Sequence, residues 1–393
     1  MQPDIYMPRG FRCAGIAAGI KASGTKDMAM ILSDTPAAAA GVFTTNQVCA
    51  APVKVCREHL AHGTARAIVM NSGIANACTG SAGLLASRNM AAETAEVIRC
   101  LPQEIFVCST GKIGPQLPLE KIAAGIGRLH EAAQGHHVRD TAEAMMTTDT
   151  RPKISIAEVQ IEQKTVRIVG LAKGAGMIEP NMATMLAYIT TDAAVEQPAL
   201  QRALKRAVDR SFNRITVDGD QSTNDTVLAL ANGAAENTPL NNESVEWTVF
   251  EQALEKVCFE LAMMIVHDGE GADKFVTVTV QGAVSDEEAD QAARAVANSL
   301  LNKTAWAGTY PDWGRIMDSI GYSKARVIEE QVDIFYDRTQ AVAGGCRSDV
   351  AQEELIKVVS QTEFAINIDL HIGEGTATVY TCNCTEEYVR INY

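Results

Sequence analysis

Apolar residues in the first 110 positions occur in short runs separated by small turn residues, mostly glycine and alanine. Runs of this length between turn residues favour β-strands. Residues 84–99 and 119–133 instead repeat apolar positions at helical spacing, which predicts helices. Strands that alternate with helices predict an α/β fold of packed layers. The predicted strands are residues 28–32, 40–43, 67–70 and 105–108.

The same patterns continue through the rest of the chain. Two β-rich runs, residues 154–161 and 166–171, predict a hairpin with its turn at residues 162–164. No repeat and no low-complexity linker marks a sharp domain boundary. Helical spacing predicts helices over residues 197–212, 246–267, 286–302 and 349–359. Further strands are predicted over residues 275–281, 332–336, 364–372 and 376–381.

Composition narrows the class of protein and of partner. A chain of 393 residues is long enough for two lobes and a substantial core, and 47% hydrophobic with 21% charged residues is ordinary for a globular protein. A net charge of −14 argues against nucleic acid or an anionic membrane as the main partner. No apolar run is long enough for a membrane helix, and the first nine residues do not resemble a signal peptide. We therefore expect a cytoplasmic protein.

Neither cysteine nor histidine suggests a metal site. Most of the ten cysteines lie among apolar residues, so we expect buried thiols, and Cys382 and Cys384 are the only close pair. The seven histidines lack the company of other ligands at metal-binding spacing. Gly174 and Gly176 lack the third glycine of a dinucleotide-binding fingerprint, and no Walker sequence occurs. We expect no metal and no nucleotide cofactor.

Thr184 is a candidate nucleophile. It follows a glycine-rich turn and leads into an apolar run. A threonine hydroxyl is a weak nucleophile unless a base lies beside it, and the α-amino group of an N-terminal residue, with a pKa of about 7.7–8.0, can be that base. Thr184 gains a free amine only if the Ala183–Thr184 bond is cut. From the residues alone, an ordinary threonine at the start of a buried segment is the favoured interpretation.

Thr110 and Gly111 have a structural and a chemical interpretation. They follow an apolar strand, where a turn can direct N–H and hydroxyl groups at one point, as an oxyanion hole requires. From the residues alone, an ordinary turn between strand and loop is the favoured interpretation. By the same reasoning Lys173 is a surface residue, and Glu270, between two glycines after a helix, is part of a helix cap.

The segment from Lys173-Gly-Ala-Gly-Met-Ile178 through Pro180-Asn-Met-Ala-Thr-Met-Leu186 resembles the self-cleavage segment of the ornithine acetyltransferase family (glutamate N-acetyltransferase, ArgJ), nearly residue for residue. The resemblance extends over nearly the whole chain. It includes residues 41–46, 71–80, 211–220 and 313–316.

The resemblance implies a self-processing N-terminal-nucleophile architecture, a layered α/β sandwich shared with self-cleaving aminopeptidases. Cleavage between Ala183 and Thr184 would produce an alpha chain of residues 1–183 and a beta chain of residues 184–393. The two chains would stay associated, as a heterotetramer of two alpha and two beta chains.

The resemblance also implies an activity. A glutamate N-acetyltransferase of arginine biosynthesis moves the acetyl group of N-acetylornithine to glutamate by a ping-pong route through acetyl-Thr184. Small-molecule substrates would be its ligands, no cofactor is needed, and acetyl-CoA as a second donor stays open, because some members accept it for amino-acid N-acetylation. Thr110 and Gly111 match the oxyanion pair. The substrate-binding positions match Thr147 (with Thr148 as the alternative), Lys173, Thr184, Glu270 and Asn392.

Several positions depart from the family pattern. Ile74 replaces an asparagine, Lys112 replaces an apolar residue, and Tyr310-Pro-Asp312 replaces Asp-Pro-Asn. The chain stops at Tyr393, whereas relatives usually run a few residues past the asparagine and place another Thr or Ser on the substrate. These departures leave two alternatives open: a threonine amidase or aminopeptidase in which water is the acceptor, and an uncleaved, non-catalytic protein.

Overall fold

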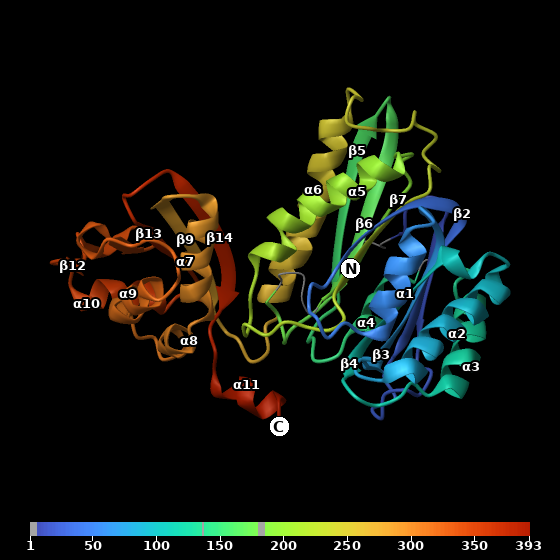
Figure 1. The fold of residues 1–393 in the computed structure, drawn as a ribbon, viewed down its shortest axis with the longest axis horizontal. Coiled ribbons are helices and arrows are strands. Elements are labelled where there is room, and N and C mark those ends of the chain that lie inside the picture. Colours follow the sequence, from blue (N-terminus) through green and yellow to red (C-terminus); the bar gives the residue numbers. More distant parts are fainter. Residues whose placement is uncertain (1–5, 136, 180–184) are drawn as a thin grey trace. The chain divides into compact units, whose positions relative to one another are not determined.

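The computed structural model describes residues 6–135, 137–179 and 185–393. These residues form two compact units. Unit 1 contains the described residues of 1–174, 180–213 and 220–265, and unit 2 contains residues 175–179, 214–219 and 266–393. The chain therefore passes between the units several times, and neither unit is one continuous stretch of sequence (Figure 1).

Unit 1 is built on an eight-stranded sheet in the order β4-β3-β2-β8-β7-β6-β5, with β1 paired to β2. The β3–β4 and β7–β8 pairs are parallel, and the other pairs are antiparallel. The strands are β1 (Phe11–Ile16), β2 (Met28–Phe43), β3 (Thr64–Ile74), β4 (Ile105–Lys112), β5 (Lys153–Ile161), β6 (Lys164–Lys173), β7 (Leu186–Thr191) and β8 (Thr226–Ala231).

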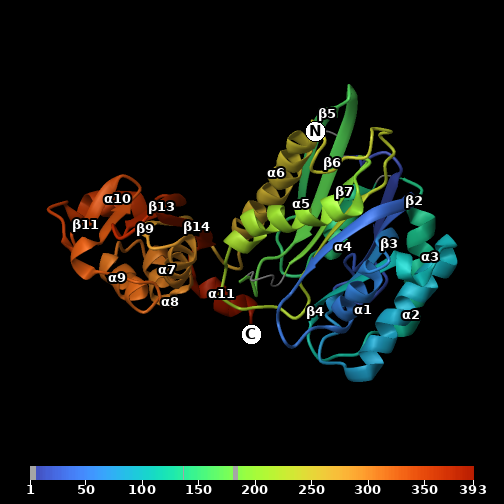
Figure 2. The ribbon, with the colours of Figure 1, turned by 45° about the horizontal axis from the view of Figure 1, so that its top comes forward.

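Helices cover this sheet. Two of them, α1 and α2, contact β4, and α5 contacts β2. Close approach of Val257 and Leu261 to Gly170 places α6 on β6, and Figure 2 shows α6 running along β5 and β6. The helices are α1 (Ala51–Leu60), α2 (Gly80–Ile98), α3 (Leu119–Ala132), α4 (Val138–Met145), α5 (Gln197–Arg210) and α6 (Trp247–Val266), with short 3-10 turns at Pro102–Glu104 and Phe212–Arg214.

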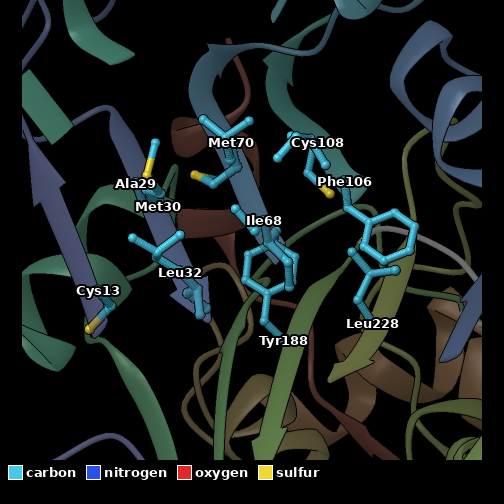
Figure 3. Packing of buried hydrophobic residues seen from close by; sticks show 14 of the residues in the cluster. Cys13, Ala29, Met30, Leu32, Ile68, Met70, Phe106, Cys108, Tyr188 and Leu228 are labelled. Carbon is cyan, nitrogen blue, oxygen red and sulfur yellow. The ribbon is translucent and has the colours of Figure 1, made fainter. Parts of the chain in front are cut away.

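The core of unit 1 joins strands that are distant in sequence. Ile68, Phe106, Tyr188 and Leu228, from β3, β4, β7 and β8, are all at most 1% exposed and belong to one cluster (Figure 3). Burial of such apolar surface is the main favourable contribution to folding. The cluster therefore ties the strands that follow residue 184 to the strands that precede it.

Unit 2 is a second α/β layer with its own core. Its six-stranded sheet has the order β12-β11-β10-β13-β9-β14, in which β9 and β13 are parallel. Helix α7 packs on β9 and β14. The strands are β9 (Phe275–Ala283), β10 (Asp333–Tyr336), β11 (Thr339–Ala343), β12 (Cys346–Arg347), β13 (Glu363–Asp369) and β14 (Gly375–Cys382). The helices are α7 (Asp286–Asn298), α8 (Leu300–Ala307), α9 (Trp313–Gly321), α10 (Gln352–Val359) and α11 (Glu386–Ile391), with a 3-10 turn at Glu329–Gln331.

The predicted layered α/β fold is confirmed, and two element predictions need correction. The helix predicted over residues 286–302 is two helices, because Ser299 is extended and its side chain caps the second. The strands predicted at 28–32 and 40–43 are one strand, β2, with a register shift between Leu32 and Ala37. The 154–171 hairpin is confirmed as β5 and β6.

The order of strands in unit 1 bears on the predicted cleavage. β7 and β8 follow residue 184 in sequence, yet β7 is bonded to β6 and β8 is bonded to β2. A cut between residues 183 and 184 would thus leave strands of both products interleaved in one sheet.

Among the described residues, none of the helices is both long and apolar enough to cross a bilayer.

Candidate active site

The turn after β4 carries Thr110 and Gly111. In the parallel pair β3–β4, Thr110 lies opposite Ser72 and Gly111 opposite Gly73. Gly111 has a φ of +124°, and a Cβ there would lie 2.3 Å from the carbonyl carbon of Gly73. Only glycine fits such a position. The close approach of the two strand ends fixes the turn, and Thr110 is 7% exposed beside it.

Lys173, the last residue of β6, reaches this turn. Its Nζ donates a hydrogen bond of 3.3 Å to Thr110 Oγ1, and the residue is only 3% exposed. Lys173 is therefore a buried residue and not a surface one. The structure thus brings Thr110 on β4 and Lys173 on β6 together, although four other strands lie between β4 and β6 in the order of the sheet.

The loop that carries Thr147 is tied to the same strand end by Asp149. Asp149 Oδ2 accepts the N–H of Thr147 at 3.0 Å, and Oδ1 accepts the N–H of Gly174 at 2.7 Å. Oδ1 also accepts a hydrogen bond from Lys153 Nζ at 2.7 Å. Thr147 itself is exposed, as is Thr148. Asp149 thus holds the predicted substrate loop next to Lys173.

Positive charge accumulates around Asp149. Burial alone would raise the pKa of this carboxyl, but the charges of Lys173 and Lys153 and the hydrogen bonds from Lys153 and Gly174 lower it to about 2. Burial lowers the pKa of nearby Lys21, an effect that the carboxylates of Asp27 and Asp149 oppose. Three lysines around one ionised aspartate suit a carboxylate ligand.

Ala183 and Thr184 lie outside the described residues, so the nucleophile and the cleaved bond stay predictions. The next residue, Met185, donates its N–H to Asp225 Oδ1 at 2.6 Å. Leu186 then pairs with Lys173 on β6 and with Thr226 on β8. The start of β7 is therefore fixed between Lys173 and Asp225.

The segment before β8 supplies residues that sequence reasoning missed. Asn224 Nδ2 donates to the carbonyl oxygens of Ala75, at 2.6 Å, and Ser109, at 2.8 Å. Asn224 thereby connects the start of β8 to the residue before Thr110, and the fully buried Asp225 follows it. The sequence feature that could have indicated Asn224 and Asp225 is a run of polar residues immediately before an apolar strand. Asp149 lies in a similar polar, hydroxyl-rich loop before β5.

Unit 2 brings the other two predicted substrate residues together. Asn392 Nδ2 donates to Glu270 Oε2 at 2.7 Å and to the carbonyl oxygen of Tyr388 at 2.9 Å. Glu270 is 8% exposed, and its N–H donates to Ala175 O at 2.9 Å. A Cβ on Gly176 would lie 2.3 Å from the carboxyl carbon of Glu270, so this close contact requires glycine.

The segment that precedes the predicted cleavage point is held firmly within unit 2. Asp218 accepts the N–H groups of Met177 at 2.5 Å and Ile178 at 2.8 Å. Arg294 forms an ion pair of 3.0 Å with Glu179. Met177 has a φ of +57°, an uncommon conformation for a side chain of this size, which these neighbours maintain.

In the part of the chain that the structure describes, no three His, Cys, Asp or Glu side chains are grouped to hold a metal ion. All ten cysteines have free thiols, including the close pair Cys382 and Cys384. Burial raises the pKa of both thiols. Raised values disfavour the thiolate that metal binding requires.

Comparison with known proteins places the chain in a family. The profile of the ArgJ family matches residues 12–393. The chain belongs to the ArgJ family. It is 48% identical over 385 residues to the arginine biosynthesis bifunctional protein ArgJ of Geobacter sulfurreducens, with 98% of each chain covered. The protein of the same name from Shouchella clausii is 46% identical, with 98% of this chain and 94% of the relative covered.

A solved structure extends the comparison to the fold. The crystal structure of the ArgJ protein from Bacillus halodurans is 41% identical to this chain. The match covers 52% of this chain and 97% of that chain, with a TM-score of 0.50. The resemblance seen in residues 173–186 is therefore confirmed as membership of the ArgJ family.

Two of the departures from the ArgJ pattern lie at the same place. Ile74 ends β3 and pairs with Lys112, which ends β4 just after Gly111. Asn71 Nδ2 donates to Ile74 O at 2.9 Å, so the backbone of the unusual residue is held in place. Both residues thus border the turn that carries Thr110.

Proposed function

We propose that this protein is a self-cleaving acetyltransferase of arginine biosynthesis, which moves the acetyl group of N2-acetyl-L-ornithine to L-glutamate. Membership of the ArgJ family supports the general role, because relatives 48% and 46% identical over nearly the full chain are named arginine biosynthesis bifunctional proteins. The observation that carries the chemistry is the bond between Lys173 and Thr110 beside the start of β7.

The first step we propose is self-cleavage. The hydroxyl of Thr184 attacks the carbonyl carbon of Ala183, and the peptide bond between them becomes an ester. Water then hydrolyses the ester, which frees the α-amine of Thr184. This amine becomes the base for the hydroxyl in later turnovers.

The second step is acetyl transfer in two halves. The Thr184 hydroxyl attacks the acetyl group of N-acetylornithine, and ornithine leaves. Glutamate then attacks the acetyl-Thr184 ester. The oxyanion formed in each half accepts hydrogen bonds from the Thr110 hydroxyl and the Gly111 N–H, and the ammonium of Lys173 beside Thr110 adds positive charge where negative charge develops.

Charge also suits the substrates of this reaction. Lys21, Lys153 and Lys173 surround Asp149 and favour an α-carboxylate near the exposed Thr147. Glu270, which accepts a hydrogen bond from Asn392, suits an ammonium group. Acetyl-CoA as a second donor, which would add amino-acid N-acetyltransferase activity, is supported only by the word "bifunctional" in the names of relatives.

The interleaved strands support lasting association of the products. β7 and β8 of the beta chain are bonded between β6 and β2 of the alpha chain. Separation would break both strand pairs and expose the core that they share. An assembly of two alpha and two beta chains and a cytoplasmic location complete the proposal.

The test is the intact mass and amino-terminal sequence of the purified protein beside Thr184→Ala. Two fragments, one of which begins Thr-Met-Leu-Ala, with an uncut mutant, are expected. A single wild-type chain of 42.1 kDa contradicts the proposal. Labelled N-acetylornithine then distinguishes the acceptor, because label in acetylglutamate indicates a transferase and label in acetate indicates a hydrolase.

A further inference from the structure

Only one of the two carboxyl oxygens of Asp225 has a hydrogen-bond partner among the described residues. The residue is fully buried just before β8. Its Oδ1 accepts the N–H of Met185 at 2.6 Å, whereas Oδ2 has no hydrogen-bond partner among the described residues. A buried polar atom without a partner is costly to stability, so natural proteins rarely retain one without a reason.

The surroundings hold this carboxyl rigidly. The backbone of Asp225 accepts the N–H of Thr44 at 3.0 Å, and the N–H of Thr226 donates to Met185 O at 3.1 Å. Neighbouring Asn224 is bonded to two carbonyl oxygens of the β3 and β4 ends. The position of Oδ2 is thus determined by the sheet itself.

A purely structural role does not require an acid here. Asparagine has the same shape and its Oδ1 could accept the same N–H of Met185. What aspartic acid adds is the ability to take up and release a proton. Thr184 is covalently attached to the nitrogen that Asp225 Oδ1 binds, so the reacting hydroxyl and amine belong to the residue next to this contact.

We propose that Asp225 transfers the proton in self-cleavage, from the hydroxyl oxygen of Thr184 to its backbone nitrogen. This proposal rests on the proposed function. The O–H proton passes to Asp225 Oδ2 as the oxygen bonds to the Ala183 carbonyl carbon. The C–N bond then breaks, and the proton passes from Oδ2 to the nitrogen that leaves. Hydrolysis of the ester by water restores the hydroxyl and releases the Ala183 carboxylic acid.

The electrostatic surroundings suit a group that must both accept and donate a proton. Burial raises the pKa of Asp225 well above the ordinary aspartate value, and the Met185 N–H and the charge of Lys173 on β6 oppose that rise. A carboxyl whose pKa is raised by burial can hold the proton that it takes from the hydroxyl and then donate it to the leaving nitrogen.

The experiment follows precursor processing during cell-free translation, where the full-length band and the two fragments are separated on a gel. Asp225→Asn keeps the shape and the acceptor for Met185, and Asp225→Ala removes both. Asp318→Asn, at an exposed site on α9, is the matched control. Circular dichroism melts of the purified proteins report whether each variant folds.

We expect Asp225→Asn to fold and to cleave at least about 100-fold more slowly, as loss of a general acid–base group usually does. Wild-type cleavage should rise with pH as Asp225 ionises, and the residual rate of Asp225→Asn should lose that rise. If Asp225→Asn cleaves at the wild-type rate while Asp225→Ala is slow, the residue only positions Met185 and the proposal is wrong. An uncut wild-type chain would instead refute the proposed function itself.

Discussion

The ammonium of Lys173 lies 3.3 Å from the hydroxyl oxygen of Thr110, although the two residues are 63 positions apart. Lys173 ends β6 and Thr110 nears the end of β4, so the contact unites strands that the sheet keeps well separated in its order. This contact places a buried positive charge on the predicted oxyanion turn.

Lys173→Met should lower kcat/KM for acetyl transfer by about 100-fold, because loss of a charged group at an oxyanion site typically has an effect of this size. Initial rates with N-acetylornithine and glutamate measure the loss. Lys205→Met, on the exposed face of α5 and paired only with Asp209 among the contacts described, is the control and should behave as wild type. Equal rates of acetyl transfer for both variants would show that Lys173 does not contribute to the reaction.

Gly111→Ala should destabilise the protein and abolish activity. The new Cβ would meet the Gly73 backbone at 2.3 Å, and φ would remain at +124°. A drop in the melting temperature of several degrees is expected, which corresponds to a few kcal/mol.

Gly127→Ala is the matched control for this substitution. Gly127 lies within α3 and has nothing within 4 Å of the added Cβ. Alanine in a helix interior should raise the free energy of unfolding by about 0.5–1 kcal/mol. A Gly111→Ala protein that melts as high as wild type would show that the turn can open.

The stability of the protein should fall in acid through Asp149. Its pKa in the fold is about 2, below the ordinary value of 3.8, so its contribution is complete above pH 3.8 and is lost as the pH falls from 3.8 toward 2. The shift corresponds to about 2 kcal/mol. Urea unfolding at several pH values between 2 and 7 measures the free energy of unfolding.

The Asp149→Asn variant separates the contribution of Asp149 to acid stability from that of the other acidic residues. It should remove that part of the pH dependence and destabilise the protein at pH 7 by about 3–5 kcal/mol, because Lys153 and Lys173 lose a buried counter-charge. If wild type and Asp149→Asn lose stability in parallel below pH 4, Asp149 is not the group that titrates.

Asn392→Ala should raise the KM for the amino-acid substrate more than it lowers kcat. Asn392 Nδ2 is a donor to Glu270 Oε2 at 2.7 Å, and hydrogen bonds to charged groups contribute about 1.5–3 kcal/mol. A rise in KM of about tenfold is expected from steady-state kinetics. Tyr393→Ala is the control, since Tyr393 is 92% exposed. An unchanged KM for Asn392→Ala would mean that Glu270 is held without it.

Much of the fold was predictable because its signals are local. The β5–β6 hairpin followed from two β-rich runs around a short turn, and α6 followed from helical spacing over residues 246–267. The break at Ser299 was missed, since the apolar spacing of the two helices continues across it and only the backbone conformation of one residue separates them.

The sequence by itself determined the kinds of elements, the family and the residue types available for acyl transfer, because periodicity and a long motif can be read along the chain. The tertiary structure decided that β7 and β8 lie between β2 and β6, and that Asp149 and Asp225 flank the Lys173 end of the site. Buried carboxylates of this kind leave little local signal. Their role comes from strand register and from a low-dielectric interior, and both exist only when distant segments pack together.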